Sequence, residues 1–159
     1  MDENHLPFFG VGPYLVLIMG ISTITSIILT YYHLIPVITI KELNMVLISL
    51  GVVMIVIGAV FWLLAIFNSR IDKRIENNEL VTTGIYAHVR HPIYATFLYI
   101  SVGLILISQN IILLILPEIF WAFLSLVMKK TEEKWLIDLY GDEYIIYSKK
   151  VNRFIPKVI

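Results

Sequence analysis

The sequence contains no cysteine and little charge. Without cysteine, disulfides, thiolate metal sites and a cysteine nucleophile are all excluded. Charged residues make up only 15% of the chain, whereas a soluble domain typically carries about 25%. The 12 basic and 12 acidic residues give a formal net charge of zero. No overall positive charge therefore favours nucleic acid as a partner.

Apolar residues are abundant, at 58% of the 159 residues, and they form four runs at about 14–32, 43–67, 92–107 and 111–128. A helix of about 20 apolar residues spans a bilayer. We therefore predict one all-α integral membrane domain over residues 1–159, with four transmembrane helices. The three polar residues 108–110 predict a tight helical hairpin between the last two helices. The polar and aromatic tail, 129–159, is expected to be helical to Tyr140 and to restart after Gly141.

Small residues recur at helix-packing spacings in the first two runs. Gly51, Gly58 and Ala65 follow one another every seven residues and so lie along one seam. Ser22 and Ser26 are four residues apart, a spacing that lets two helices approach closely. Both patterns predict helix–helix contacts rather than a functional site.

The distribution of basic residues predicts the orientation in the membrane. With four spans, both termini and the loop 68–91 share one face, and the opposite face carries only Lys41. The shared face holds the other eleven: Arg70, Lys73, Arg74, Arg90, Lys129, Lys130, Lys134, Lys149, Lys150, Arg153 and Lys157. Because positive charge is retained inside, we predict a multi-pass protein with both termini and the site 68–91 plus 129–159 cytoplasmic. The membrane would be the plasma membrane if the protein is prokaryotic.

The stretch LVTTGIYAHVRHPIY, residues 80–94, lies between two apolar runs and has a composition that no lipid-facing helix needs. Its helical period breaks at Gly84 and restarts at Pro92, a residue favoured at the first position of a helix. Arg90 and His91 thus lie beside free backbone N–H groups that can hold an anion. The alternative is that these two side chains only anchor a helix end.

The fourth run carries a polar stripe. At 100° per residue, five side chains fall within an arc of about 60°: Glu118, Trp121, Ser125, Lys129 and Glu132. The stripe predicts that Glu132 lies under the start of the third helix, while Glu133 points away into solvent. Glu118 and Trp121 are substrate-side candidates, because an intramembrane carboxylate is costly and is functional by default. The alternative for Glu118 is a protonated side chain bonded to a nearby hydroxyl.

Together, LVTTGIYAHVRHPIY, an apolar hairpin and TEEKWLIDLYGDEYIIYSKKVNRFIP resemble the isoprenylcysteine carboxyl methyltransferases and the related phospholipid methyltransferases. These are integral membrane enzymes that use S-adenosylmethionine. The resemblance covers about residues 68–156 and combines Gly-x-Tyr, Arg-His-Pro-x-Tyr, Glu-Glu and Gly-x-x-Tyr in order. It implies catalytic roles for Arg90, His91 and Glu132.

The resemblance also implies a set of cofactor contacts: Asn78, Glu79, Leu80, Val81, Gly84, Tyr86, His91, Pro92, Ile93, Tyr94 and Glu132. Asn78 and Glu79 replace a pattern that usually contains histidine. The arginine that usually precedes Glu-Glu is absent, so Lys129 or Lys130 takes its place on the substrate side. No metal is implied.

The chemistry of these residue types agrees with the resemblance. Aromatic faces such as Tyr86 and Tyr94 attract a sulfonium cation. Helix N-terminal amides with Arg90 or His91 suit a carboxylate, and Glu132 suits an amine or ribose hydroxyls. A carboxylate acceptor needs no base, whereas an amine acceptor needs one, and His91 is the histidine placed to serve.

We therefore predict a methyltransferase that moves a methyl group from S-adenosylmethionine to a lipidic acceptor, with the carboxylate of an isoprenylcysteine-like substrate favoured. Phosphatidylethanolamine N-methylation is the alternative acceptor chemistry. Two other classes of protein stay open: an NADPH-dependent sterol-type reductase and a non-catalytic membrane adaptor. The sequence shows no extra basic cluster that would bind the 2′-phosphate of NADPH, which counts against the reductase. The expected partners are the lipidic or prenylated substrate and membrane lipids, with no nucleic acid.

Overall fold

The computed structural model describes residues 11–67 and 79–157, and these are helical apart from short connections. The long helices are α1 (Gly12–Tyr31), α2 (Asn44–Phe67), α4 (Pro92–Ile107) and α5 (Ile115–Lys130), and the short ones are α6 (Glu132–Tyr140) and α7 (Asp142–Lys150). Three 3₁₀ turns, η1 (Lys41–Leu43), η2 (Gly84–Ala87) and η3 (Ile111–Leu114), lie in the connections. Within the described residues, extended pairing is confined to one isolated bridge between Val89 and Asn152. The all-α prediction is confirmed.

The helix bounds follow the hydrophobic runs closely. With η3 counted as the start of the fourth run, every helix end lies within two residues of its predicted position. Three helical stretches, Gly12–Tyr31, Lys41–Phe67 and Ile111–Tyr140, are long and apolar enough to cross a membrane. The fourth, α4, is a shorter apolar helix of 16 residues, about 24 Å long at 1.5 Å per residue.

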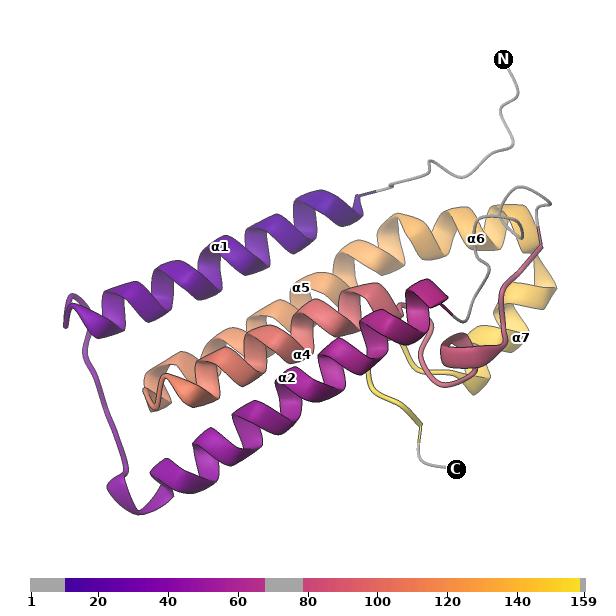
Figure 1. The fold of residues 1–159 in the computed structure, drawn as a ribbon. Helices are drawn as coiled ribbons and strands as arrows, with labels where there is room; N and C mark the ends of the chain where they lie inside the picture. The colour runs from indigo at the N-terminus through magenta and orange to yellow at the C-terminus, as the bar shows by residue number, and fades with distance from the viewer. Residues whose placement is uncertain (1–10, 68–78, 158–159) are drawn as a thin grey trace.

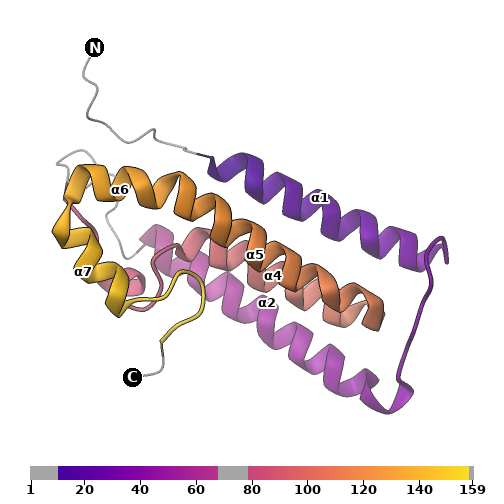
Figure 2. The ribbon, with the colours of Figure 1, turned by 180° about the vertical axis from the view of Figure 1, so that it is seen from behind.

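The four long helices lie side by side, and α6 and α7 gather at one end of them (Figures 1 and 2). Helix α4 packs against α2, α1 and α5. It is accordingly the most enclosed helix, with Ala95, Leu98, Ser101 and Ile105 among its buried residues. The helix that begins at the Arg-His-Pro motif is thus held on several sides.

Small residues allow α2 and α4 to approach until their backbones touch. A Cβ atom on Gly51 would lie 2.6 Å from the carbonyl oxygen of Gly103, and one on Gly58 would lie 2.9 Å from that of Thr96. Gly51, Gly58 and Ala65 are buried, so the predicted seam is confirmed. On α1 the buried residues are Leu15, Met19, Thr23 and Thr30, and Ser22 and Ser26 are only half-buried beside them.

A buried asparagine ties the connections together at the opposite end of the bundle from α6 and α7. The Asn110 side chain is 1% exposed. Its amide donates to Thr30 Oγ1 (3.2 Å) and to the Pro36 carbonyl (3.1 Å), and its carbonyl accepts from the Ile38 amide (3.2 Å). Because both ends of the side chain are satisfied, Asn110 fixes the loop after α1 against the turn after α4.

Candidate active site

The chain after α7 runs alongside the residues that precede α4. The amide of Arg90 donates to the carbonyl of Asn152 (2.8 Å), and the amide of His91 donates to the carbonyl of Arg153 (3.0 Å). The parallel bridge between Val89 and Asn152 belongs to the same contact. Val89 and Phe154 are almost completely buried there. These bonds bring the Arg-His-Pro motif and the tail together, as the sequence predicts.

Glu133 lies at the centre of a buried ion cluster. Arg153 binds it as a fork, with Nε 2.8 Å from Oε1 and Nη2 2.7 Å from Oε2. Arg90 Nη1 lies 2.9 Å from Oε1, and the side chains of Arg90 and Glu133 are only 8% and 7% exposed. The prediction that Glu133 is solvated is therefore wrong. Its carboxylate joins α6, the start of α4 and the tail.

The helix phase explains the error. The prediction assumed one continuous helix through Glu132, but α5 ends at Lys130 and the backbone departs from helical angles at Thr131 (φ −120°, ψ −90°). Helix α6 starts at the next residue. The interruption shifts the rotational phase of everything after it, so that Glu133 as well as Glu132 faces the start of α4.

His91 lies between the two carboxylates. Its Nδ1 is 3.7 Å from Glu132 Oε2, and its Nε2 is 3.5 Å from Glu133 Oε1. The ring is 6% exposed and contacts Tyr94 edge-on, with 5.8 Å between ring centroids, and Phe154 at 6.1 Å. The predicted grouping of His91 with Glu132 at the start of α4 is confirmed.

Glu132 is the more accessible of the two acids. Its Oε1 accepts a hydrogen bond from the Tyr94 hydroxyl, and its side chain is 20% exposed compared with 7% for Glu133. Glu133 forms ion pairs with two arginines, Arg90 and Arg153. The carboxylate of Glu132 contacts only the Tyr94 hydroxyl and the His91 ring. Glu132 is thus the carboxylate that remains available to a cationic ligand.

A layer of tyrosines closes the site on the side of α7. Arg90 Nη1 donates to the Tyr144 hydroxyl (3.3 Å), and the Tyr147 hydroxyl donates to the Tyr86 carbonyl (2.6 Å). Burial, with the charge of Glu133 adding to it, raises the pKa of Tyr144 to about 12. Burial and then the charge of Glu132 raise the pKa of Tyr86. These two phenols therefore stay protonated at neutral pH.

The remaining predicted cofactor residues lie around this core to different degrees. Leu80 packs on the Tyr144 and Tyr147 cluster, and Pro92 is buried at the first turn of α4. The others are half-buried (Val81) or exposed (Glu79, Gly84 and Ile93). Gly84 adopts a positive φ of 64°, a conformation in which glycine is favoured. Asn78, with the segment 68–78, lies outside the described residues.

The three substrate-side candidates of α5 are not brought to this cluster. Glu118, Trp121 and Lys129 are exposed, and the buried residues of α5 are Phe120, Leu124 and Met128. These three side chains therefore face outward from the bundle, whereas Glu132, the last residue of the predicted stripe, faces the start of α4. Their part in substrate binding stays a prediction.

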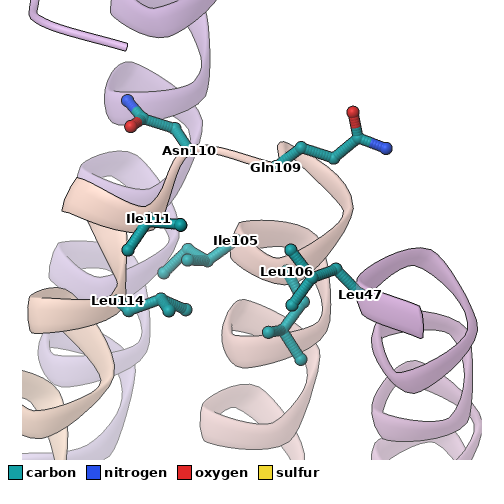
Figure 3. A pocket seen from close by; sticks show the side chains of 7 residues that line it. All are labelled: Leu47, Ile105, Leu106, Gln109, Asn110, Ile111 and Leu114. Atoms are coloured by element: carbon teal, nitrogen blue, oxygen red, sulfur yellow. The ribbon is translucent and has the colours of Figure 1, made fainter. Parts of the chain in front are cut away.

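One depression is lined by residues at the opposite end of the bundle. It lies between α2, the end of α4 and η3, its lining includes Leu47, Ile105 and Asn110 (Figure 3), and the volume that a water-sized sphere could occupy there is about 0 Å³. Cofactor and ligand pockets are usually about 300–1,000 Å³. This depression is too small and too far from the ion cluster to be the cofactor site.

Sequence reasoning missed Arg153 and the structural role of Glu133. Arg153 is one of eleven basic residues assigned to the same face, and nothing in its spacing distinguishes it from a solvated cation. The weak signal is its position: it precedes Phe154-Ile155-Pro156, an apolar segment in a polar tail. A charged side chain that such a segment draws into the interior is almost always paired.

Comparison with known families now bears on this site. A family model described as phospholipid methyltransferase matches residues 39–143, which include α2, the Arg-His-Pro motif and both glutamates. The chain belongs to the phospholipid methyltransferase family. With its three apolar helices, it is a multi-pass membrane protein. Helix α1 and the tail with Arg153 lie outside the match.

Relatives in the family carry names that describe a specific reaction. The chain is 39% identical over 88 residues to "Protein-S-isoprenylcysteine O-methyltransferase" of Schizosaccharomyces pombe. The aligned segment covers 55% of this chain and 37% of that protein. It is 31% identical over 116 residues to the human protein of that name, covering 67% and 40%. It is 29% identical over 118 residues to "Protein-S-isoprenylcysteine O-methyltransferase B" of Arabidopsis thaliana, covering 69% and 59%. The chain thus spans less than two thirds of the length of each of these relatives.

Proposed function

We propose that the protein transfers a methyl group from S-adenosylmethionine to the carboxylate of an isoprenylcysteine-like lipidic acceptor. The observation that carries this proposal is the pairing of an accessible Glu132 with a buried His91 at the start of α4, inside the family match. The names of the relatives support the acceptor. The family description itself supports the second candidate, N-methylation of a phospholipid amine.

The residues present fit the methyl donor. Its ammonium and sulfonium require a carboxylate and aromatic faces, which Glu132, Tyr86 and Tyr94 supply. Its carboxylate requires donors, and one buried nitrogen of the cluster, Arg90 Nε, lacks a hydrogen-bond partner within the described residues. Buried donors are rarely left without a partner unless a ligand or water completes the site.

Each side chain has a defined task in the proposed reaction. When bound, S-adenosylmethionine would supply an electrophilic methyl group on its sulfonium, and loss of that methyl group would leave neutral S-adenosylhomocysteine. Glu132 would hold the cationic side of the donor, and the Tyr94 hydroxyl, which donates to Glu132 Oε1, fixes the orientation of Glu132. The ion pairs of Glu133 with Arg90 and Arg153 hold the tail over the site, which excludes water and keeps the reacting groups aligned. A carboxylate acceptor attacks directly, because it is already an anion.

The enclosure of His91 favours the carboxylate over the amine. Both ring nitrogens face acids of α6, and Tyr94 and Phe154 pack on the ring. A general base must lie within hydrogen-bond reach of the proton that it removes. With its nitrogens engaged in this way, His91 is arranged to bind and orient a ligand rather than to deprotonate an acceptor.

We also propose that α1, α2, α4 and α5 all span the membrane and that α4 and α5 form a hairpin whose open end faces the cytoplasm. The distribution of basic residues supports this orientation. The 16 residues of α4 reach about 24 Å, so the helix would begin close to the polar surface, where Arg90 and His91 need to be.

Single-cysteine labelling should test the four spans, since the chain has no cysteine to remove. The cysteine is placed at one of three exposed glutamates. Glu79 lies before α4, Glu143 lies in α7, and Glu42 lies in η1. In intact cells, an impermeant maleimide should label Glu42→Cys alone, and permeabilisation should make the other two reactive. If Glu79→Cys and Glu143→Cys react from opposite sides, α4 and α5 do not both span the membrane and the proposed topology is wrong.

Calorimetry on the purified protein tests the proposed function against its competitors. We expect S-adenosylmethionine and S-adenosylhomocysteine to bind and NADPH not to bind. Binding of NADPH alone would support a reductase, and binding of none of the three would support a non-catalytic adaptor. Either result would contradict the proposal.

A further inference from the structure

The first turn of α1 touches the hydroxyl group that orients Glu132. A Cβ atom placed on Gly12 would lie 2.7 Å from Tyr94 Oη, closer than real Cβ atoms approach a heavy atom. Val11 and Leu15, on either side of Gly12, pack into the same core as Tyr94. Figures 1 and 2 show this end of α1 at the same end of the bundle as α6 and α7. The contact therefore belongs to the site, although α1 lies outside the family match.

The Tyr94 hydroxyl has little freedom to move away from Gly12. It donates to Glu132 Oε1, and its ring is 8% exposed and packs against His91. By contrast, the ring carbons next to the hydroxyl would lie 3.4 and 3.6 Å from the added Cβ, which is ordinary van der Waals contact. Only the hydroxyl oxygen requires glycine at position 12. Any side chain there would displace the group that fixes Glu132.

We propose that Gly12 is a positioning residue of the cofactor site and that α1 completes this site by seating the Tyr94 hydroxyl against Glu132. This inference rests on the proposed function for its binding consequence, because Glu132 is the carboxylate available to the cationic donor. Its geometric part is independent of the donor. Gly12 acts through Tyr94 and touches no ligand itself.

A double-mutant cycle tests the inference, with the full-length variants Gly12→Ala, Tyr94→Phe and their combination. Gly20→Ala is the matched control, because it adds the same atom to the same helix and a Cβ there meets nothing within 4 Å. The first readout is the thermal midpoint without ligand. The second is the Kd for S-adenosylhomocysteine, measured by calorimetry.

We expect Gly12→Ala to lower the thermal midpoint and to raise the Kd at least about threefold, since a hydrogen bond to a charged acceptor is weakened rather than removed. Gly20→Ala should leave the Kd unchanged and should not lower the midpoint, because alanine is more favourable than glycine in a helix interior. In the Tyr94→Phe background, Gly12→Ala should add nothing to either readout, because the oxygen that clashes is gone. This non-additivity distinguishes positioning from general damage to α1.

Two results would overturn the inference. Equal effects of Gly12→Ala with and without the Tyr94 hydroxyl, or none at all, would show that the contact does not matter. Coupling in the midpoint but not in the Kd would show that it serves stability alone. If the wild-type protein binds neither S-adenosylmethionine nor S-adenosylhomocysteine, the proposed function fails instead, while the midpoint cycle still tests the contact.

Discussion

Glu133→Gln should lower the thermal midpoint far more than Glu132→Gln does, although the two residues are adjacent. Removing the charge of Glu133 leaves Arg90, whose side chain is 8% exposed, as a buried cation without its counter-ion. Breaking a buried ion pair from one side costs about 3–5 kcal/mol. The same change should weaken cofactor binding, because the tail that Arg153 holds over the site is released.

Glu132→Gln should show the opposite profile. We expect a Kd for S-adenosylmethionine at least tenfold higher, about 1.4 kcal/mol, with a nearly unchanged midpoint, because its side chain is more exposed and holds no arginine. Glu143→Gln, an exposed acid on α7, is the control and should alter neither quantity. A Glu133→Gln protein as stable as the control would contradict the ion cluster as the element that joins α6 to the tail.

Removing Arg90 as well provides an internal check of this account. The pair Arg90→Gln with Glu133→Gln leaves no buried charge unpaired, so its thermal midpoint should lie above that of Glu133→Gln alone. Cofactor binding should not recover, since the fork between Glu133 and Arg153 is still missing. A double variant less stable than Glu133→Gln would show that the burial of Arg90 is not the source of the loss.

His91→Asn should raise the apparent KM for S-adenosylmethionine about tenfold and change kcat by less than about twofold. A substitution that affects KM alone removes binding common to the ground and transition states. We expect this pattern because both ring nitrogens of His91 face carboxylates of α6. The control is His88→Asn, which alters an exposed side chain three residues earlier. Initial rates at saturating and limiting donor separate the two constants.

The pH dependence of kcat tests independently whether the methyl acceptor is a carboxylate or an amine. A carboxylate acceptor, with a pKa near 4, is ionised throughout the range from about pH 6 to 9. An amine acceptor is mostly protonated there and attacks only after losing a proton. We therefore expect a nearly flat kcat across this range. A kcat that climbs with pH, together with a loss of about 100-fold or more in His91→Asn, would assign His91 as a general base and would contradict the proposed acceptor.

Hydrophobic runs and turn residues predict the fold well because they act locally. Pro92 starts α4, and Gly141, with φ 53°, separates α6 from α7. The period of Gly51 and Gly58 depends only on helical geometry and predicts the face that packs on α4. The structure of a long apolar run is also easy to predict, because an apolar run of this length in a membrane satisfies its backbone hydrogen bonds by forming a helix.

The ion cluster could not be predicted in the same way, because it depends on one backbone irregularity and on a distant partner. A single non-helical residue, Thr131, rotates Glu133 inward. Its partner Arg153 is 20 positions further along the chain, and main-chain bonds of Asn152 and Arg153 set its place. Likewise, the contact between Gly12 and Tyr94 joins segments that no sequence period relates. Tertiary contacts of this kind are set by packing rather than by local pattern.

The transfer of a radiolabelled methyl group tests the central claim most directly. The purified protein is incubated with S-adenosylmethionine and, in parallel, with a small prenylcysteine analogue or with phosphatidylethanolamine, and each product is then treated with base. We predict label on the prenylcysteine analogue that base releases, as expected of a methyl ester. Base-stable label on phosphatidylethanolamine, with none on the prenylcysteine analogue, would contradict the account.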